Sequence, residues 1–582
     1  MFKQKIKQVT DKIPKVVNDQ SFIISILFIF FIVALYKFAF FIGNNSVDFP
    51  FWDQWGTANI LTGAEKSNLF QILFYQHNEH RIGVGLLIIK ILANSSNWSQ
   101  LLEIKFVSLL ITSSSLLIMG VKYFISKKFE ILDLIIPLII LNIFQFENLI
   151  WGFQIAFVLP LFLFCLWIYA LLKIKSAQWR YGALIILSVL SSFSSFHGLI
   201  LPILTIILGI IEYYKHRSIS VKLIWLVLLA NISIIALYFI NYTSNFQTKL
   251  SIIPTWEMVK YFSAAISNGF FFNANNTFIN ILIACTVVLL FIIGVFKFIQ
   301  NKKEDNHTLV GCLLLAYSII FIGIIAMGRS AFGIEQAFSS RYVTFSMLTP
   351  LGLFFIFSSI THGKYLKIIL LIFVVSNSIF LSSGVIHSHM YNVTPKKQRA
   401  LTCYTVSPIE EWSTCFKIFS FYPNEDYLNQ RLLKTLEYKR AGNNSPFSTH
   451  TPINSKLNVA EKCEGSIDII NNLTPIPQNI TVSGVLEISG WLVPSLDTAN
   501  TAKDTYVVLT NERNENTFFP THKSYRPDVG IHFKDEKLNN SGFEATINML
   551  PLQGAYTLGI AYKEKNGGIK LCPQFRIATT VQ

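Results

Sequence analysis

The residues best suited to chemistry lie in two short segments, 48–55 and 76–81, which contain carboxylates beside aromatic or basic side chains. A carboxylate close to a substrate hydroxyl can act as a general base. Asp53 lies between two tryptophans, a residue type that favours the membrane interface, so we expect it to be held at a membrane surface and to be the base. Glu79 is its closest rival. It ranks second because the basic residues that follow it would stabilise its charged form and so weaken it as a base.

The same two segments also allow plainer interpretations. Asp48 precedes Phe-Pro, a turn-forming context that gives it a structural reason to be present. The whole cluster could also be a polar loop at a membrane interface. His77 and His80 flank Glu79, but they lack the i, i+4 spacing of a helical zinc site. A divalent metal is therefore not favoured, and no cofactor is certain.

A second group of candidates occupies residues 328–342, where Arg329 and Arg341 lie on either side of a glycine-containing loop. Two arginines brought together there would form a bidentate clamp for a phosphate group. The structural alternative is that these arginines pair with Glu335.

Two single polar residues complete the set of candidates. Glu147 is followed closely by Trp151 and Gln154, and His197 lies at the junction of two short apolar segments. A lone histidine at such a junction is more often a hydrogen-bonded structural group than a catalyst.

Composition identifies the class of protein in which these residues must act. Of the 582 residues, 52% are hydrophobic and only 14% are charged, and the mean hydropathy is +0.47. An average soluble domain carries about 25% charged residues. Disorder, collagen-like repetition and a small disulfide scaffold each need a different bias, so we expect a polytopic α-helical membrane protein.

Eleven apolar runs approach the length that a bilayer-spanning helix needs. The two runs that end at Ser195 and Ile211 are short enough to form a re-entrant pair instead, which would change the count. The expected spans are Phe22–Ile42, Phe106–Ile125, Ile131–Phe144, Ile155–Leu172, Tyr181–Ser195, Leu199–Ile211, Leu223–Ile240, Ile279–Phe296, Leu309–Met327, Thr344–Ser359 and Ile368–Val385.

The basic residues predict the orientation of these spans. With the N-terminus in the cytoplasm, every even-numbered span ends in lysines or arginines, as the positive-inside rule requires. This sidedness explains the net charge of +15 without a nucleic-acid partner. An odd number of spans places everything after Val385 outside. Four cysteines lie there, where disulfides are permitted, and the pairing we favour among three is Cys403–Cys415 with Cys463–Cys572.

These observations divide the chain into three parts. Residues 1–385 form the membrane domain with a first outer loop at 43–100, residues 386–462 form a linker with a helix expected at Asn424–Tyr438, and residues 463–582 form a β-sandwich module. The strands expected in the module are Ile480–Val493, Tyr506–Thr510, Phe543–Met549 and Tyr556–Tyr562.

An acidic loop directly after the first helix, a many-helix membrane domain and an exported C-terminal domain together resemble the GT-C class of lipid-phosphate-sugar-dependent glycosyltransferases. The order of the motifs resembles more closely the Gtr-type inner-membrane enzymes that decorate O-antigen and related surface polysaccharides. The resemblance covers roughly residues 20–440, although His197-Gly198 stands where such proteins often have Asn-Gly. The motifs are Asp53-Gln-Trp55, Asn78-Glu79-His80-Arg81, Gly328-Arg329…Gly333…Ser340-Arg341-Tyr342 and Tyr422-Pro423…Leu428.

The resemblance implies an inverting glycosyltransferase that moves a sugar, such as a glucose-like hexose, from a polyprenyl phosphate such as undecaprenyl phosphate to a hydroxyl of O-antigen, lipopolysaccharide or another surface glycan. It implies a bacterial inner membrane protein with a periplasmic C-terminal domain and with membrane lipids around it. The implied catalytic residues are Asp53 and Glu79, the implied donor-phosphate ligands are Arg81, Arg329, Arg341 and Tyr342, and the implied substrate contacts are Asp48, Trp55, His80, Glu147 and His197.

Two other functions remain open at this point. A transporter or flippase for a lipid-linked sugar would be expected to show inverted repeats and mid-membrane ionisable residues. An O-antigen polymerase or ligase would also use outer arginines, but it is not expected to carry the acidic loop or the long β-rich C-terminus. A pure binding module is least expected, because eleven spans are far more than an anchor requires.

Overall fold

The computed structural model describes residues 20–380 and 458–581 apart from short gaps, together with Thr394, Lys397 and Leu401. The expected helix at 424–438 and the cysteines Cys403 and Cys415 lie outside the described residues. The chain folds into two compact units. One comprises Met1–Ser46, Lys66–Asn94 and Gln100–His387, and the other comprises Val47–Glu65, Ser95–Ser99 and Ser388–Gln582.

The first unit is helical. Among the described residues, nine helical segments are long and apolar enough to cross a membrane. The chain is therefore a polytopic helical protein with a β-rich C-terminal part. The nine segments are Gln20–Asn45 (α2), Gln100–Ser126 (α6), Ile131–Leu149 (η1, α7, η2 and α8), Gly152–Lys173 (η3 and α9), Phe196–Lys215 (η4 and α11), Val221–Tyr238 (α12), Thr277–Gln300 (α14), Asn306–Phe332 (α15 and η5) and Ser340–Ser358 (α16 and α17).

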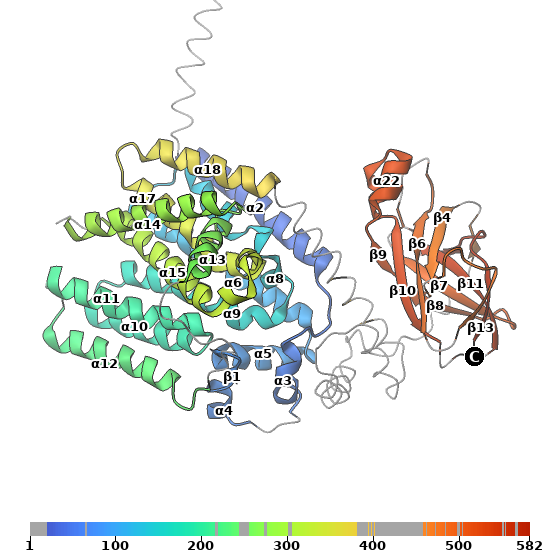
Figure 1. The fold of residues 1–582 in the computed structure, drawn as a ribbon, viewed down its shortest axis with the longest axis horizontal. Coiled ribbons are helices and arrows are strands. Elements are labelled where there is room, and N and C mark those ends of the chain that lie inside the picture. Colours follow the sequence, from blue (N-terminus) through green and yellow to red (C-terminus); the bar gives the residue numbers. More distant parts are fainter. Residues whose placement is uncertain are drawn as a thin grey trace, which may run out of the picture. The chain divides into compact units, whose positions relative to one another are not determined.

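The other two expected spans are also helices, α10 (Ala177–Ser192) and α18 (Gly363–Phe380), which fall outside this set of nine. The last span was expected to continue to Val385, but the described part ends at Phe380. Helices α10, α11 and α12 lie side by side in one layer of the unit (Figure 1).

Two expected single helices are interrupted. The third span breaks into η1 (Ile131–Leu134), α7 (Ile135–Ile140), η2 (Ile143–Gln145) and α8 (Phe146–Leu149), and the Asn142 side chain accepts a hydrogen bond from the Phe144 amide at the break. The tenth breaks between α16 (Ser340–Ser346) and α17 (Leu348–Ser358), where Pro350 has no N–H to donate to the Ser346 carbonyl. Both breaks place polar side chains at helix ends.

Close packing between α15 and α17 depends on two glycines that face each other. A Cβ added to Gly311 would lie 2.8 Å from the Gly352 carbonyl oxygen, and one added to Gly352 would lie 2.9 Å from the Gly311 carbonyl oxygen. Small residues at such a crossing let two helix backbones approach, as they do between membrane helices.

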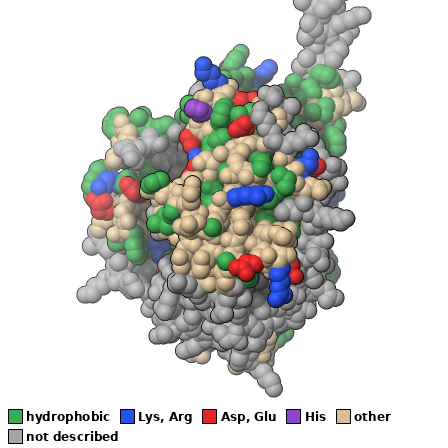
Figure 2. Space-filling model, turned by 90° about the vertical axis from the view of Figure 1, so that its right-hand side faces the viewer, with side chains coloured by type: hydrophobic (Ala, Val, Ile, Leu, Met, Phe, Trp, Pro, Cys, Tyr) green, Lys and Arg blue, Asp and Glu red, His purple; other side chains and the backbone are tan. Residues whose placement is uncertain are grey.

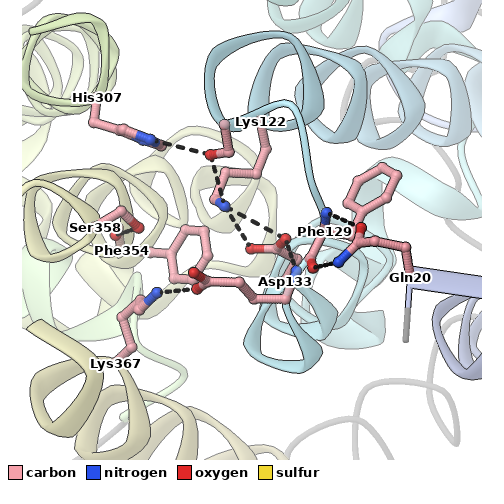
Figure 3. Close-up of polar contacts among 10 residues, drawn as sticks. Gln20, Lys122, Phe129, Asp133, His307, Phe354, Ser358 and Lys367 are labelled. Carbon is pink, nitrogen blue, oxygen red and sulfur yellow. Dashed lines mark hydrogen bonds and ion pairs between the residues drawn. The ribbon is translucent and has the colours of Figure 1, made fainter. Parts of the chain in front are cut away.

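A partly buried polar network joins one end of α6 to η1, α15 and α18 (Figure 3). The Lys122 ammonium lies 3.2 Å from an Asp133 carboxylate oxygen and donates to Ser126 Oγ at 3.0 Å. Ser126 Oγ lies 3.1 Å from His307 Nε2, and Lys367 pairs with Glu130 at 2.6 Å. We call these six residues the Lys122 network. Because its charges are paired, it fastens the broken third span to its neighbours.

The C-terminal part of the second unit contains two sheets that share one hydrophobic core. The first has the order β4-β6-β10-β9, and the second has the order β3-β12-β11-β13-β5, with β7 beside β11 and β8 beside β7. The core combines Ile488 and Phe543 of the first sheet with Leu509 and Leu558 of the second. The strands are β3 (Asn458–Val459), β4 (Glu464–Ile470), β5 (Asn479–Val482), β6 (Val485–Val493), β7 (Thr505–Asn511), β8 (Asn516–Pro520), β9 (His522–Ser524), β10 (Gly542–Asn548), β11 (Gly554–Lys563), β12 (Ile569–Leu571) and β13 (Ile577–Val581).

Three details of this region bear on the sequence-based predictions. The expected strand Ile480–Val493 is two strands, β5 and β6, that belong to different sheets. Cys463 and Cys572 form a disulfide, which is the pairing favoured from the sequence. On the face of the β-rich region that Figure 2 shows, described acidic and basic side chains are interspersed and form no patch of one sign.

Residues 43–100 are more ordered than a loop. They contain α3 (Gln54–Leu61), α4 (Leu69–Leu73), the hairpin β1 (Gln76–His77) and β2 (His80–Arg81), and α5 (Gly83–Ser96). In the first unit, α5 packs tightly on α9, because a Cβ on Gly85 would lie 2.6 Å from the Ala156 Cα. The hairpin is thereby held by the helix that follows it.

Candidate active site

The tip of the β1–β2 hairpin brings Glu79 to the end of α15. Asn78 adopts a positive φ of 49° at the turn, and the Glu79 carbonyl oxygen accepts hydrogen bonds from the hydroxyls of Tyr238 at 3.3 Å and Tyr242 at 3.0 Å. Glu79 Oε2 then lies 3.5 Å from Arg329 Nη2. These side chains are 17% and 36% exposed, so a carboxylate and a guanidinium from segments 250 residues apart meet at an accessible surface.

Arg81 has a role different from the expected one. It is 3% exposed, and its guanidinium donates to the backbone carbonyls of Phe74, Tyr238 and Ile240. Burial lowers the pKa of Arg81, although an arginine remains protonated at neutral pH. Its N–H groups donate to carbonyls at the C-terminal end of α12 and anchor the hairpin. Few N–H groups of the guanidinium therefore remain for a donor phosphate.

The second arginine is built into a more complete arrangement. Glu147 Oε2 accepts hydrogen bonds from Ser339 Oγ at 2.9 Å, Ser340 Oγ at 2.6 Å and the Arg341 amide at 3.1 Å. Arg341 Nη2 lies 3.9 Å from Glu147 Oε1, and Arg341 Nε donates to Ser339 Oγ at 3.2 Å. Glu147 therefore holds the start of α16 and the side chain of Arg341, rather than presenting an unoccupied carboxylate to a substrate.

Neighbouring amides reinforce the same loop. Asn148 Nδ2 donates to the Arg341 carbonyl at 2.8 Å and to Thr344 Oγ1 at 2.6 Å. From the other side, Asn268 Nδ2 donates to the carbonyls of Ala337 at 3.3 Å and Ser339 at 3.4 Å. The loop at residues 328–342, which carries both arginines, is thus held between α8 and α13 (Trp256–Asn268). The ion pairs it forms are with Glu79 and Glu147, while Glu335 is exposed.

Helix α13 contributes a residue that the sequence analysis missed. Tyr261 is 1% exposed, and burial raises its pKa; Tyr342 beside it raises the pKa further, whereas Arg329 and Arg341 lower it. Tyr261 and the buried Tyr342 therefore form a wall close to both arginines. The Thr255 side chain accepts a hydrogen bond from the Met258 amide, so a capping threonine before an amphipathic run was the signal available in the sequence.

The histidines form a separate chain of contacts. His80 Nδ1 accepts a hydrogen bond from the Phe196 amide at 3.3 Å and lies 3.3 Å from Ser195 Oγ. Ser195 Oγ lies 3.0 Å from His197 Nδ1, and His197 Nε2 lies 3.1 Å from the Phe157 carbonyl. His197 is 3% exposed and its ring packs among phenylalanines, so in this structure it is buried and not at an accessible surface.

The remaining candidates belong to the second unit. Trp55 is fully buried and packs edge-on against Phe49 and Trp98, so it supports α3 and is not open to a substrate. Asp48 accepts a hydrogen bond from Ser99 Oγ at 3.0 Å. Asp53 is half-buried at the N-cap position of α3, where its side chain makes no capping hydrogen bond.

A buried lysine near this segment was also missed. Lys397 is 3% exposed and its ammonium lies 4.6 Å from the centre of the Phe51 ring. Burial lowers the pKa of Lys397 to about 7. A lysine that titrates near neutrality can exchange protons, although no pattern in the sequence singles it out.

Within the described ranges, no group of three or more His, Cys, Asp or Glu side chains is placed to hold a metal ion. The chemistry offered by the first unit is a carboxylate beside an arginine, with a second arginine and two tyrosines close by. Such a set can bind an anion and accept a proton. Comparison with known proteins adds nothing to this: the chain matches no protein-family model, no curated protein and no solved structure.

Proposed function

We propose that this chain is a membrane-embedded glycosyltransferase that moves a sugar from a polyprenyl phosphate to a hydroxyl of a surface glycan. The observation that carries the proposal is the 3.5 Å contact between the Glu79 carboxylate, at the tip of the β1–β2 hairpin, and the Arg329 guanidinium, at the end of α15, both partly exposed. The lysine distribution predicts that this end faces the outside, and the resemblance to Gtr-type enzymes implies that the outside is the periplasm of a bacterial inner membrane.

The reaction needs the two kinds of group found here. Direct displacement passes through an oxocarbenium-like transition state and inverts the anomeric carbon. The attacking hydroxyl must lose a proton to a base, and the phosphate leaving group needs cationic stabilisation more than it needs a proton. In this proposal Arg329 and Arg341, which both lie close to Tyr261, supply the cations.

The choice of base changes with the contacts. The sequence places Asp53 first, but Asp53 belongs to the second unit, whereas Glu79 lies in the same unit as Arg329 and 3.5 Å from it. Arg81 was expected to weaken Glu79 as a base, but its guanidinium binds backbone carbonyls. Arg329 is the arginine that contacts Glu79, so Glu79 can act as the base once Arg329 binds another anion. We therefore propose Glu79 as the base and retain Asp53 as its rival.

The experiment is a transfer assay with the full chain in lipid nanodiscs. Radiolabelled hexosyl polyprenyl phosphate and an acceptor glycan are supplied, and incorporation is compared among the wild type, Arg329→Ala and the exposed-site control Glu335→Gln. We expect transfer by the wild type and the control, and a loss of about 10²–10³ in rate for Arg329→Ala, as for removal of a transition-state donor. In sealed vesicles that contain the same chain, movement of the intact lipid-linked sugar across the bilayer without transfer would instead identify a flippase.

A further inference from the structure

The two arginine–carboxylate pairs of the site are built differently. Glu147 accepts hydrogen bonds from two hydroxyls and one amide in addition to its contact with Arg341, and it belongs to the fold of the loop. Glu79 and Arg329 meet only through one oxygen and one nitrogen at 3.5 Å. The first pair is therefore fixed, and the second is held by a single, partly exposed contact of the kind that contributes little to stability.

The surroundings of Arg329 leave its side chain 36% exposed. Arg329 ends α15, and Gly333 four residues later has a φ of +98°, a conformation that favours glycine. Its guanidinium also lies 5.7 Å from the ring of Phe332, which is 57% exposed. The side chain is therefore bounded on the accessible side by an aromatic ring and by Glu79.

We propose that Glu79 and the phosphate of the incoming donor compete for the Arg329 guanidinium. When the phosphate binds Arg329, the Glu79 carboxylate is released and can act as the base. This inference rests on the proposed function. It follows from the strength of the contacts, since a phosphate can accept two parallel hydrogen bonds from a guanidinium, whereas Glu79 receives one long contact.

The exchange couples donor binding to the chemical step. Once the phosphate occupies Arg329, Glu79 accepts the proton of the acceptor hydroxyl as that oxygen forms its bond to the anomeric carbon. The bond between that carbon and the phosphate oxygen breaks, and its electron pair leaves with the polyprenyl phosphate, whose charge Arg329 and Arg341 stabilise. Without a donor, Glu79 remains paired, so the base is available only when the sugar is in place.

The test measures phosphate binding by calorimetry on the full chain in detergent. The probes are farnesyl phosphate, inorganic phosphate and the neutral alcohol farnesol. Glu79→Gln removes the competitor and should tighten binding of farnesyl phosphate roughly two- to fivefold, the size of an exposed ion pair. Arg329→Ala should abolish that gain when combined with Glu79→Gln, and farnesol should bind each variant equally. A gain for inorganic phosphate alone would point to a free-anion site.

Two matched variants control for charge and folding. Glu335→Gln removes an exposed carboxylate from the same region, so it should leave the affinity unchanged if the effect is local. Glu147→Gln should weaken binding, because it loosens the loop that holds Arg341. Thermal unfolding of each variant identifies any that is misfolded, and Arg329→Lys paired with Glu79→Gln then replaces the alanine variant.

The outcomes separate the exchange from the proposed function. An unchanged or weaker affinity in Glu79→Gln, with transfer by the wild type intact, overturns the exchange and leaves the function standing. Tighter binding in a chain that transfers no sugar supports the exchange and overturns the function. Absence of phosphate binding by the wild type overturns both.

Discussion

Glu147 Oε2 lies 3.1 Å from the backbone nitrogen of Arg341, a residue 194 positions later in the chain. The same oxygen accepts hydrogen bonds from both serines that precede Arg341. One carboxylate thus caps the start of α16 and sets the position of an arginine, which is a positioning role.

Replacing Glu147 with Ala should destabilise the loop and weaken phosphate binding together. Hydrogen bonds to a charged group contribute about 1.5–3 kcal/mol each, and those that Ser339, Ser340 and the Arg341 amide donate would be lost. Glu147→Gln keeps one acceptor oxygen and should recover part of both properties. Thermal unfolding and farnesyl phosphate titration measure the two effects. A variant that is less stable but binds phosphate normally would show that Glu147 has no role in placing Arg341.

The identity of the base can be decided by two isosteric substitutions. Glu79→Gln should lower the transfer rate by about 10²–10⁴, the range for losing a general base. Asp53→Asn should retain transfer if Glu79 is the base, because the amide keeps the shape of the side chain and removes only its ability to accept a proton. Single-turnover rates at saturating donor separate the chemical step from binding. If Asp53→Asn is inactive at equal expression and Glu79→Gln is active, the base is Asp53.

The Lys122–Asp133 pair predicts a stability effect far from the site. Lys122 is 1% exposed and Asp133 is fully buried, so removing either partner leaves a buried charge uncompensated. We expect Asp133→Ala or Lys122→Ala to cost about 3–5 kcal/mol in the free energy of unfolding. The double variant Lys122→Met with Asp133→Leu should recover most of that loss, as apolar replacements of a buried pair often do.

Unfolding of the full chain in detergent, compared as a double-mutant cycle, measures this coupling. Purely additive effects of the two single variants would mean that the pair contributes no interaction of its own. Transfer activity should be retained in the double variant, since the network lies outside the proposed site.

The β-rich region should lose stability in acid through Asp528. Hydrogen bonds from Arg526 lower the pKa of Asp528 below its usual value. Since the folded-state pKa is the lower one, the stabilisation is present above the unfolded-state pKa of about 4 and is lost as the pH falls through the folded-state value. Hydrogen exchange of β9 and β10 between pH 3 and 6 should show faster opening at the acid end. In Arg526→Ala this pH dependence should be smaller; an identical profile would contradict it.

The sequence by itself determined the long helices and several strands of the C-terminal region. Apolar runs of membrane-spanning length predicted the helices, because burial in a bilayer imposes a length and a composition on each segment separately. Alternation predicted strands in the C-terminal region, although the division of Ile480–Val493 between two sheets was missed. The interruptions of the third and tenth spans were also missed, since their average hydropathy conceals Asn142 and Pro350.

Tertiary structure alone decided the partners of the charged residues in the candidate site and in the Lys122 network. Arg81 and Glu79 are two positions apart. Arg81 nevertheless binds the carbonyls at the ends of α4 and α12, whereas Glu79 contacts Arg329. Glu147 pairs with Arg341 and Lys122 with Asp133, through helices that become neighbours only on folding. The residue type shows which interactions a side chain can make. The partner that it actually has depends on which distant segment packs beside it, and on the competing hydrogen-bond donors and acceptors of that segment.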